Sequence, residues 1–137
     1  MSKSEPTIQK FMATTPFFIE SDKTIKDASD LMSQKKIRHL PVMRSGEVVG
    51  IISDRDVKLA CGMTGADPKT LPVSSVCHEH PYMVSPDALL GEVSTMMAQK
   101  HYGSAIVVQN GKLVGIFTTV DACRALAEVL QTRFHAH

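Results

Sequence analysis

The sequence contains no tryptophan, few other aromatic residues and no excess of charge of either sign. Aromatic residues make up 5% of the chain, and 15 basic residues stand against 14 acidic ones. A surface that binds nucleic acid or an anionic membrane carries clustered positive charge, and single-strand binding also needs aromatic rings on which bases stack. The composition therefore predicts neither nucleic acid nor a membrane surface as a partner.

Long hydrophobic runs and paired cysteines are missing as well. No apolar stretch approaches the roughly 18 residues that a membrane-spanning helix needs, and residues 1–6 lack the apolar core of a signal peptide. The cysteines are Cys61, Cys77 and Cys123, an odd number with no close pairing. Free thiols in a reducing compartment are the simplest interpretation. We therefore expect a soluble, cytoplasmic protein.

Motifs that carry catalysis are also absent. The chain has no Gly-x-Ser-x-Gly, no His-Glu-x-x-His and no phosphate-binding P-loop. Cys77, His78 and His80 look locally like metal ligands, but their spacing is not that of a closed zinc site and no second cluster accompanies them. The sequence predicts neither an enzyme nor a metal site.

An internal repeat organises the chain, because many residues recur after a shift of 65 positions without a gap. The period is too long and the copies too few for a solenoid. Two copies of one supersecondary unit, packed face to face, fit the pattern better. The identical pairs are Pro16/Pro81, Asp22/Asp87, Ser29/Ser94, Met32/Met97, Gln34/Gln99, Lys35/Lys100, Val42/Val107, Gly46/Gly111, Val49/Val114, Gly50/Gly115, Ile51/Ile116, Asp56/Asp121 and Ala60/Ala125.

Both copies predict the same order of elements: a short helix, a strand, an amphipathic helix, a hairpin and a closing helix. In the first amphipathic helix, Ile25, Ala28 and Met32 recur at spacings of three and four. Asn-Gly is a strong hairpin signal and Ser-Gly a weaker one. The expected ranges are 8–12 and 73–77 for the short helices, 17–19 and 82–84 for the first strands, and 39–52 and 105–117 for the hairpins; the closing helices begin at Asp54 and Thr119.

The predicted fold class is mixed α/β (α+β), with two β-α-β-β-α motifs related by a pseudo-two-fold axis and two related clefts between them. One motif alone cannot bury both its sheet and its helices. Residues 1–62 form the first motif with an N-terminal helix, 63–71 a linker, and 72–137 the second motif with a C-terminal helix. Leu126, Val129 and Leu130 could give that last helix an apolar stripe, which would fold back on the domain or meet a partner.

One pattern closes the last strand of each copy: glycine, two apolar residues, serine or threonine, two variable residues and aspartate. In the first copy it runs from Gly50 to Ser53 and Asp56, and in the second from Gly115 to Thr118 and Asp121. One interpretation is a capping box, in which hydroxyl and carboxylate satisfy the helix start. The other is a ligand site, because a helix N-terminus attracts phosphate and a carboxylate accepts ribose hydroxyls. Both can hold together.

This pattern, the upstream segment 37–42 and the pair Thr15-Pro16 resemble cystathionine-β-synthase-type (CBS) domains over residues 8–126. The resemblance implies that Ser53 and the two threonines Thr118 and Thr119 lie near phosphate or ribose, while Asp56 and Asp121 accept the ribose hydroxyls. It further implies that adenine lies beside the first strand of each copy. The candidates for that role are Thr15, Pro16 and Phe17 in the first copy, and Pro81 and Tyr82 in the second.

The two copies are chemically unequal. The first carries Arg38, His39 and Arg55, where the aligned residues of the second are Gly103, Ser104 and Val120. An anionic ligand needs cations or amides near its phosphates, although solvated surface charge is the ordinary role of such arginines. We expect the site at Ser53 and Asp56 to bind a nucleotide more tightly.

The resemblance implies a non-catalytic regulatory module with no required cofactor, which binds AMP, ADP or ATP. It also implies a flat homodimer formed through the helices and an unidentified protein whose activity the module controls. Two alternatives stay open. One is a dimerisation or interaction module whose clefts stay empty, and the other is a sensor of S-adenosylmethionine or NAD(H).

Overall fold

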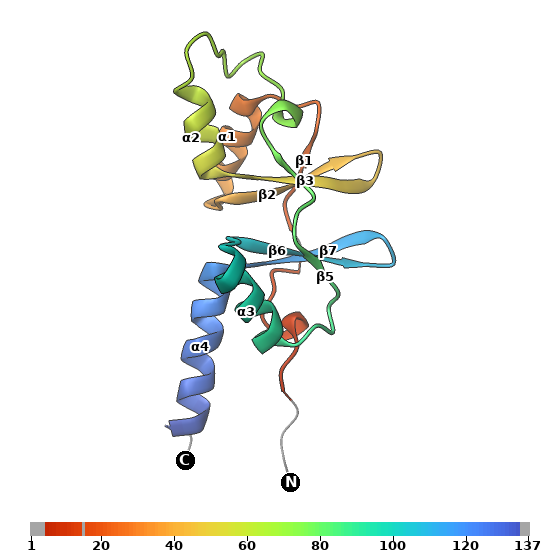
Figure 1. Ribbon diagram of the computed structural model, residues 1–137, viewed down its shortest axis with the longest axis vertical. Coiled ribbons are helices and arrows are strands. Elements are labelled where there is room, and N and C mark those ends of the chain that lie inside the picture. The colour runs from red at the N-terminus through yellow and green to blue at the C-terminus, as the bar shows by residue number, and fades with distance from the viewer. Residues whose placement is uncertain (1–4, 15, 135–137) are drawn as a thin grey trace. The chain divides into compact units, whose positions relative to one another are not determined.

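The computed structural model describes residues 5–14 and 16–134 (Figure 1). Its tertiary contacts divide the chain into two compact units. One unit comprises Phe17–Pro81. The other combines the N-terminal segment, up to Pro16, with the chain from Tyr82 onward. Both units contain helices and a sheet, so the predicted mixed α/β class is confirmed.

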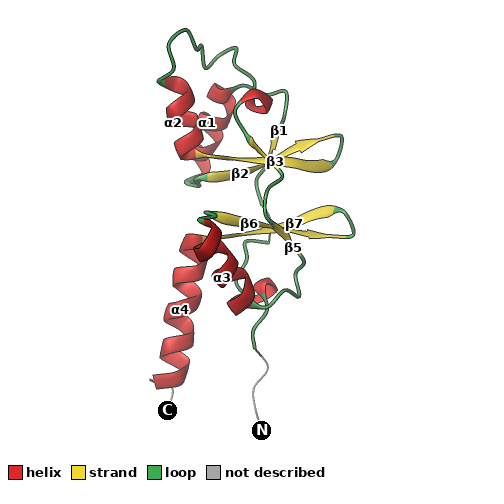
Figure 2. Cartoon of the chain, in the orientation of Figure 1, coloured by secondary structure: helices red, strands yellow, loops and turns green. Residues whose placement is uncertain are grey.

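The unit Phe17–Pro81 is built on a four-stranded sheet in the order β1-β2-β3-β4. β1 runs parallel to β2, and the other neighbours are antiparallel. The helices α1 and α2 lie on one face of this sheet (Figure 2). The bounds are β1 (Ile19–Glu20), α1 (Ile25–Lys35), β2 (His39–Arg44), β3 (Glu47–Ser53), α2 (Asp54–Cys61), the 3-10 helix η2 (Val73–Ser75) and β4 (His78–Glu79).

The second unit has a three-stranded sheet in the order β5-β6-β7, with β5 parallel to β6 and β6 antiparallel to β7. The helices α3 and α4 start on one face of this sheet (Figure 2). The bounds are the 3-10 helix η1 (Ile8–Lys10), β5 (Met83–Val84), α3 (Leu90–Lys100), β6 (Ser104–Gln109), β7 (Lys112–Thr118) and α4 (Thr119–Phe134).

Both hairpins turn where the sequence predicts. Ser45 and Gly46 have φ angles of 53° and 79°, and Asn110 and Gly111 have 54° and 77°. Two successive positive φ angles define the type I′ turn, whose twist matches that of the flanking strands. The Ser-Gly pair therefore adopts the same turn as the Asn-Gly pair, despite its weaker signal.

The short helices do not join the sequence motifs in which they lie. Ile8, in the first motif, is fully buried in the core of the second unit, and Val73, in the second motif, is fully buried in the core of the first. The compact units therefore differ from the motifs read along the sequence, because each unit is completed by the short helix that begins the other motif. The core of the first unit consists of Ile19, Ile25, Ala28, Met32, Leu40, Val42, Ile52, Val57, Ala60 and Val73, and that of the second consists of Ile8, Val93, Met97, Ala105, Val107 and Phe117.

Residues of the N-terminal segment also complete the start of α3. Thr24 caps α1 by a capping box with Asp27, but Leu89 precedes α3 and offers no side-chain acceptor. The N-terminal segment supplies acceptors instead, because Leu90 N donates to Pro6 O at 2.9 Å and Gly91 N to Glu5 Oε1 at 3.1 Å. Unsatisfied amides at a helix start need such partners.

Two strand expectations need correction. The first strand of each unit is only two residues long, and Phe17, Phe18 and Tyr82 precede it outside the strand. The strand β4 was not predicted at all; its first residue, His78, directly follows the predicted short helix. β4 forms because its backbone meets the open edge of β3, and a two-residue strand has no periodicity that could reveal it.

Glycine at position 50 permits this edge pairing. A Cβ at Gly50 would lie 2.8 Å from the carbonyl oxygen of His78 and 3.0 Å from Cys77 Sγ. In the register of the sheet, Gly50 faces Glu79 and Ile51 faces His78. Only a residue without a Cβ allows the backbone of β4 to approach this closely.

We expect Gly50→Ala to destabilise the protein by about 1–3 kcal/mol, because the new methyl group collides with the backbone of β4. Urea denaturation followed by circular dichroism measures this change. Gly62→Ala is the matched control. Its Cβ would meet the nearest atoms, two helix carbonyl oxygens, at 3.7 Å, so its effect should stay within about 0.5 kcal/mol. Equal stabilities of the two variants would contradict the role of Gly50.

Candidate functional site

The junction between β3 and α2 is held by a reciprocal pair of hydrogen bonds. Ser53 ends β3 and serves as the N-cap of α2. Its Oγ accepts from Asp56 N at 3.1 Å, and Asp56 Oδ2 accepts from Ser53 N at 2.9 Å. The capping box predicted as one interpretation is therefore present, and it fixes the carboxylate of Asp56 one turn into the helix.

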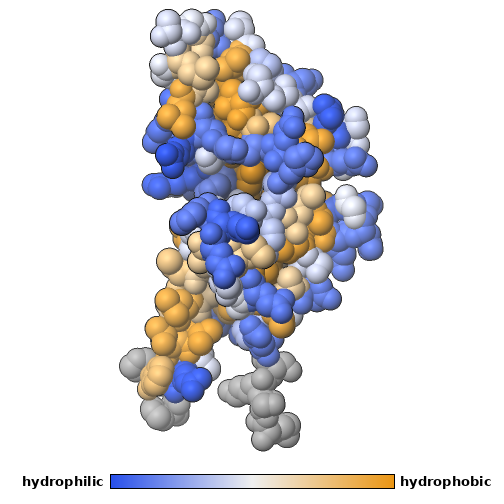
Figure 3. All heavy atoms as spheres, in the orientation of Figure 1, coloured by the Kyte–Doolittle hydropathy of each residue, from blue (hydrophilic) through white to orange (hydrophobic). Residues whose placement is uncertain are grey.

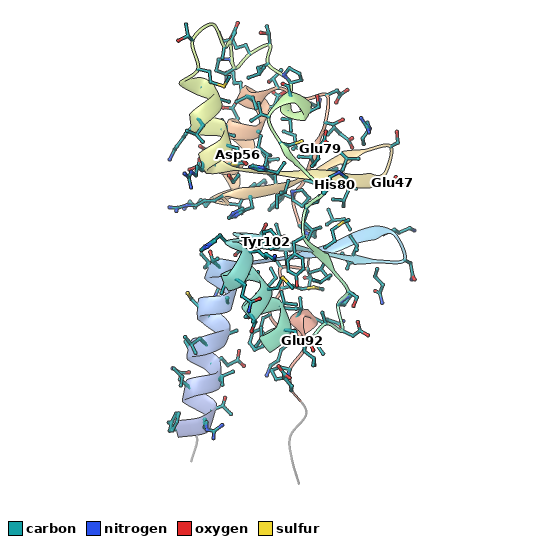
Figure 4. All side chains as sticks on the ribbon, in the orientation of Figure 1. Glu47, Asp56, Glu79, His80, Glu92 and Tyr102 are labelled. Carbon is teal, nitrogen blue, oxygen red and sulfur yellow. The ribbon has the colours of Figure 1, made fainter. Side chains whose placement is uncertain are left out.

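The other carboxylate oxygen of Asp56 has a different partner. Asp56 Oδ1 lies 2.9 Å from Nε2 of His78 on β4. The Asp56 side chain is 12% exposed and that of His78 is 70% exposed. The carboxylate is thus held in place, whereas the imidazole ring lies at the surface. Figure 4 shows Asp56 in the part of α2 that adjoins the sheet.

The remaining amides of the first turn of α2 are used unequally. Asp54 N donates to Arg38 O at 2.8 Å, and Asp56 N is taken by Ser53. In the described part of the chain, Arg55 N donates to no protein acceptor. A free amide at a helix start, together with the positive end of the helix dipole, favours an anion.

The predicted cations of this first site lie at its edge. Arg38 and Arg55 are exposed, and neither forms an ion pair within the described ranges. His39 pairs with Ser53 in the sheet and is partly buried. Burial lowers the pKa of His39. Nearby Asp56 partly counteracts this lowering of the pKa, and Arg38 reinforces it. The positive groups available at neutral pH are therefore the two arginines.

The second site repeats the junction with different partners. Asp121 Oδ2 accepts from Thr118 N at 2.9 Å and from Thr118 Oγ1 at 3.1 Å. Asp121 Oδ1 lies 3.3 Å from Nη1 of Arg124, which is on the same helix. Thr119 is the exposed first residue of α4, and its N–H donates to Gly103 O at 3.2 Å.

The imidazole beside Asp56 has no counterpart at Asp121. Under the repeat of 65 positions, His78 corresponds to Ala13. The backbone confirms this equivalence, because Ala13 bridges to Ile116 as His78 does to Ile51. Alanine offers no hydrogen-bonding side chain, so the two carboxylates differ in their outer partner.

The residues expected beside adenine lie at the points where the chain passes between the units. Pro16 ends one segment and Phe17 begins the next unit, and Pro81 and Tyr82 repeat this division. The ring of Phe17 is exposed, with Lys35 Nζ 5.0 Å from its centroid. Thr15 lies outside the described residues.

Sequence reasoning missed Tyr102 at the second site. Its ring stacks on that of Tyr82, with centroids 5.1 Å apart and planes 26° from parallel. Burial raises the pKa of the Tyr82 hydroxyl, and Tyr102 adds to this effect. Figure 4 shows Tyr102 near the start of β6. The aligned residue of the first copy is the aliphatic Ile37, so only comparison of the two copies could have indicated it.

Two further properties of the described residues bear on function. No helix among residues 5–14 and 16–134 is both long and apolar enough to cross a bilayer. In the same ranges, no three His, Cys, Asp or Glu side chains gather closely enough to hold a metal ion.

The fold and the repeated strand-to-helix junction define a known class of protein. A protein-family model described as CBS domain matches the chain twice, at residues 8–62 and 73–128. The chain therefore belongs to the CBS domain family, and its two matches form a CBS domain pair. Its curated relatives include the CBS domain-containing protein YhcV of Bacillus subtilis. The two are 30% identical over 115 residues, which cover 84% of this chain and 81% of YhcV.

Solved structures of the family share the fold. A protein from Vibrio cholerae named AcuB aligns with a TM-score of 0.85 and 27% identity, over 98% of this chain and 99% of AcuB. The CBS domain pair of MJ0100 aligns with a TM-score of 0.84 and 20% identity, over 92% and 99% of the two chains. CBSX2 aligns with a TM-score of 0.79 and 24% identity, over 90% and 97%.

The low pKa of His39 makes stability depend on pH. The unfolded chain protonates this imidazole near pH 6.5, whereas burial disfavours the charged form in the folded state. Acidification from pH 7.5 to 5.5 therefore favours unfolding. We expect His39→Gln to lose less stability over this range than the unchanged protein in urea denaturation. The exposed His80, replaced by asparagine to suit its φ of 58°, is the control. An acid response that His39→Gln leaves unaltered would refute this assignment.

Proposed function

We propose that this chain is a non-catalytic regulatory module that binds an adenosine-containing ligand of the AMP, ADP or ATP class at the starts of α2 and α4. The observation that carries the proposal is the position of Asp56 and Asp121. Each is a nearly buried carboxylate, 12% and 13% exposed. Each uses Oδ2 in the helix cap and leaves Oδ1 to exposed side chains.

This arrangement suits a ribose. Each carboxylate oxygen has two lone pairs, so Asp56 can accept from the two hydroxyls of a cis-diol while it keeps the bond to Ser53 N. The exposed partners, His78 and Arg124, can rotate aside because their side chains are 70% and 71% exposed. The cap thus orients the carboxylate for the ligand without preventing binding.

The helix starts also suit phosphate. In the first site the free amide of Arg55 and the exposed guanidinium groups of Arg38 and Arg55 are available to it, whereas the second site has Gly103 and Val120 at the aligned positions. Arginine is the side chain best suited to bidentate phosphate recognition. We therefore propose that the first site binds nucleotides more tightly than the second.

Ligands of two structural relatives support the ligand class. The CBS domain pair of MJ0100 was solved with 5′-methylthioadenosine and S-adenosylmethionine, and CBSX2 with AMP. Both bind molecules that contain adenosine. Each is less than 25% identical to this chain, so the likeness shows a shared fold alone. S-adenosylmethionine and NAD(H) therefore stay as alternative ligands.

Isothermal titration with AMP, ADP, ATP, NADH and S-adenosylmethionine tests this proposal. We expect AMP, ADP or ATP to bind, and Asp56→Ala to weaken binding by about ten-fold or more through loss of charged hydrogen bonds. The loss in Asp121→Ala should be smaller. Circular dichroism must show both variants folded, since each also loses a helix cap worth about 1 kcal/mol. Equal losses would contradict the ranking of the sites, and no binding at millimolar concentration would favour a pure interaction module.

The surface of α4 supports the homodimer implied by the family. From Leu126 onward every described residue of α4 is exposed, and four apolar side chains, Leu126, Val129, Leu130 and Phe134, form what we call the α4 apolar surface. Figure 3 shows apolar side chains along this helix. A helix without tertiary packing is marginal in water, so a covering partner would stabilise it.

We propose that a second copy of the chain covers the α4 apolar surface. An antiparallel pair centred on Leu130 would match Leu126 of one copy with Phe134 of the other. A two-fold interface uses one patch twice, as this self-complementary arrangement allows.

We expect Leu130→Glu to convert the dimer to monomer in size-exclusion chromatography with light scattering, because it buries unpaired charge in the contact. Thr132→Glu places the same charge on the opposite side of the helix and should leave the dimer intact. A dimer unaffected by Leu130→Glu would place the interface elsewhere.

A further inference from the structure

The two sites differ in the group that contacts the ligand-facing oxygen of the aspartate. Asp56 Oδ1 lies 2.9 Å from His78 Nε2, whereas Asp121 Oδ1 lies 3.3 Å from Arg124 Nη1. Histidine changes charge between pH 5 and 8, but arginine stays protonated at all accessible pH values. The two equivalent carboxylates therefore have outer partners of different chemistry.

The structure fixes the backbone of His78 and leaves its ring exposed to solvent. The pairing of Ile51 with His78 and of Gly50 with Glu79 attaches β4 to the edge of β3, at a distance that only glycine at position 50 allows. Cys77, just before His78, packs against the core of this unit. The imidazole itself is 70% exposed, so it can rotate away from Asp56 without disturbing the core.

We propose that His78 is a specificity-determining residue that competes with the ligand for Asp56 Oδ1. The imidazole of His78 occupies one lone pair of Asp56 Oδ1 and lies against that oxygen, so a ribose hydroxyl that approaches Oδ1 must crowd or displace the ring. This inference rests on the proposed function, because it concerns ribose binding at the start of α2. It adds a feature that the second site lacks, since Ala13 stands at the position equivalent to His78.

The competition depends on pH. A protonated imidazole forms a charge-assisted hydrogen bond to the carboxylate, which is stronger than a neutral one. Displacement is therefore harder when His78 is charged, and the first site binds the ribose less tightly as pH falls. At the second site the guanidinium of Arg124 keeps its charge, so the affinity there does not follow pH in this way.

Other charged and titratable groups lie on the same elements or next to these residues in the sequence. Asp54 and Arg55 lie on α2, Arg38 and His39 at the start of β2, and Cys77, Glu79 and His80 flank His78. Burial raises the pKa of the Cys77 thiol, which stays neutral between pH 5.5 and 8. His39, whose pKa burial lowers, is the neighbouring imidazole that must be tested separately.

Adenosine is the probe that isolates this effect, because it has the ribose but no phosphate, and the second pKa of a phosphate lies near 6. The Asp121→Ala background weakens the second site, so isothermal titration in it reports mainly on the first site. We expect adenosine affinity to rise by about three- to ten-fold between pH 5.5 and 8.

Three substitutions in that background identify the cause. His78→Ala should bind adenosine more tightly than its parent at pH 5.5 and show no dependence on pH. His78→Gln keeps a neutral donor and should also lose the dependence, while His39→Gln should retain it. The proposal would be overturned if the adenosine affinity of both His78 variants still rose with pH, or if His78→Ala bound adenosine more weakly than its parent at every pH.

The outcomes separate this inference from the proposed function. If AMP and adenosine bind but the His78 variants behave like the parent, His78 is not a competitor and the ligand assignment stands. If neither the parent nor His78→Ala binds either molecule at pH 8, the proposed function fails, and the competition fails with it.

Discussion

The hydrogen bond from Ser53 N to Asp56 Oδ2 is the interaction on which the candidate site depends. It joins the last residue of a strand to the first turn of a helix and holds the carboxylate in one orientation. The same bond recurs between Thr118 and Asp121 in the second unit. A carboxylate fixed by its own helix start needs little reorganisation to accept a ligand, and preorganisation of this kind lowers the cost of binding.

The capping and ligand-binding interpretations of this pattern are compatible. A cap uses one carboxylate oxygen, and in both units the other oxygen is left to side chains that are largely exposed. A duplicated scaffold that keeps its caps therefore also keeps two potential sites. Their surroundings differ at positions 38, 39 and 55, at the outer partner of the aspartate, and at the aromatic pair of Tyr82 and Tyr102, so the two candidate sites are chemically unequal.

Each compact unit is completed by residues from the start of the other motif in the sequence. Ile8 enters one core and Val73 the other, and the same segments supply backbone acceptors to the starts of α3 and α1. This exchange ties each half to the chain of the other, so neither motif has a complete core from its own residues. It also brings β4, and with it His78, to the edge of β3.

The sequence alone determined the repeat, the order of the main elements, the positions of the hairpins and the capped strand-to-helix junctions. These features are local: a turn needs particular residues at adjacent positions, and a capping box needs two residues three apart. The tertiary structure decided which unit each short helix completes, where β4 forms, and that His78 meets Asp56, which lies 22 positions earlier in the sequence. Such contacts depend on which backbone edges meet in space, and no local spacing of residues encodes that meeting.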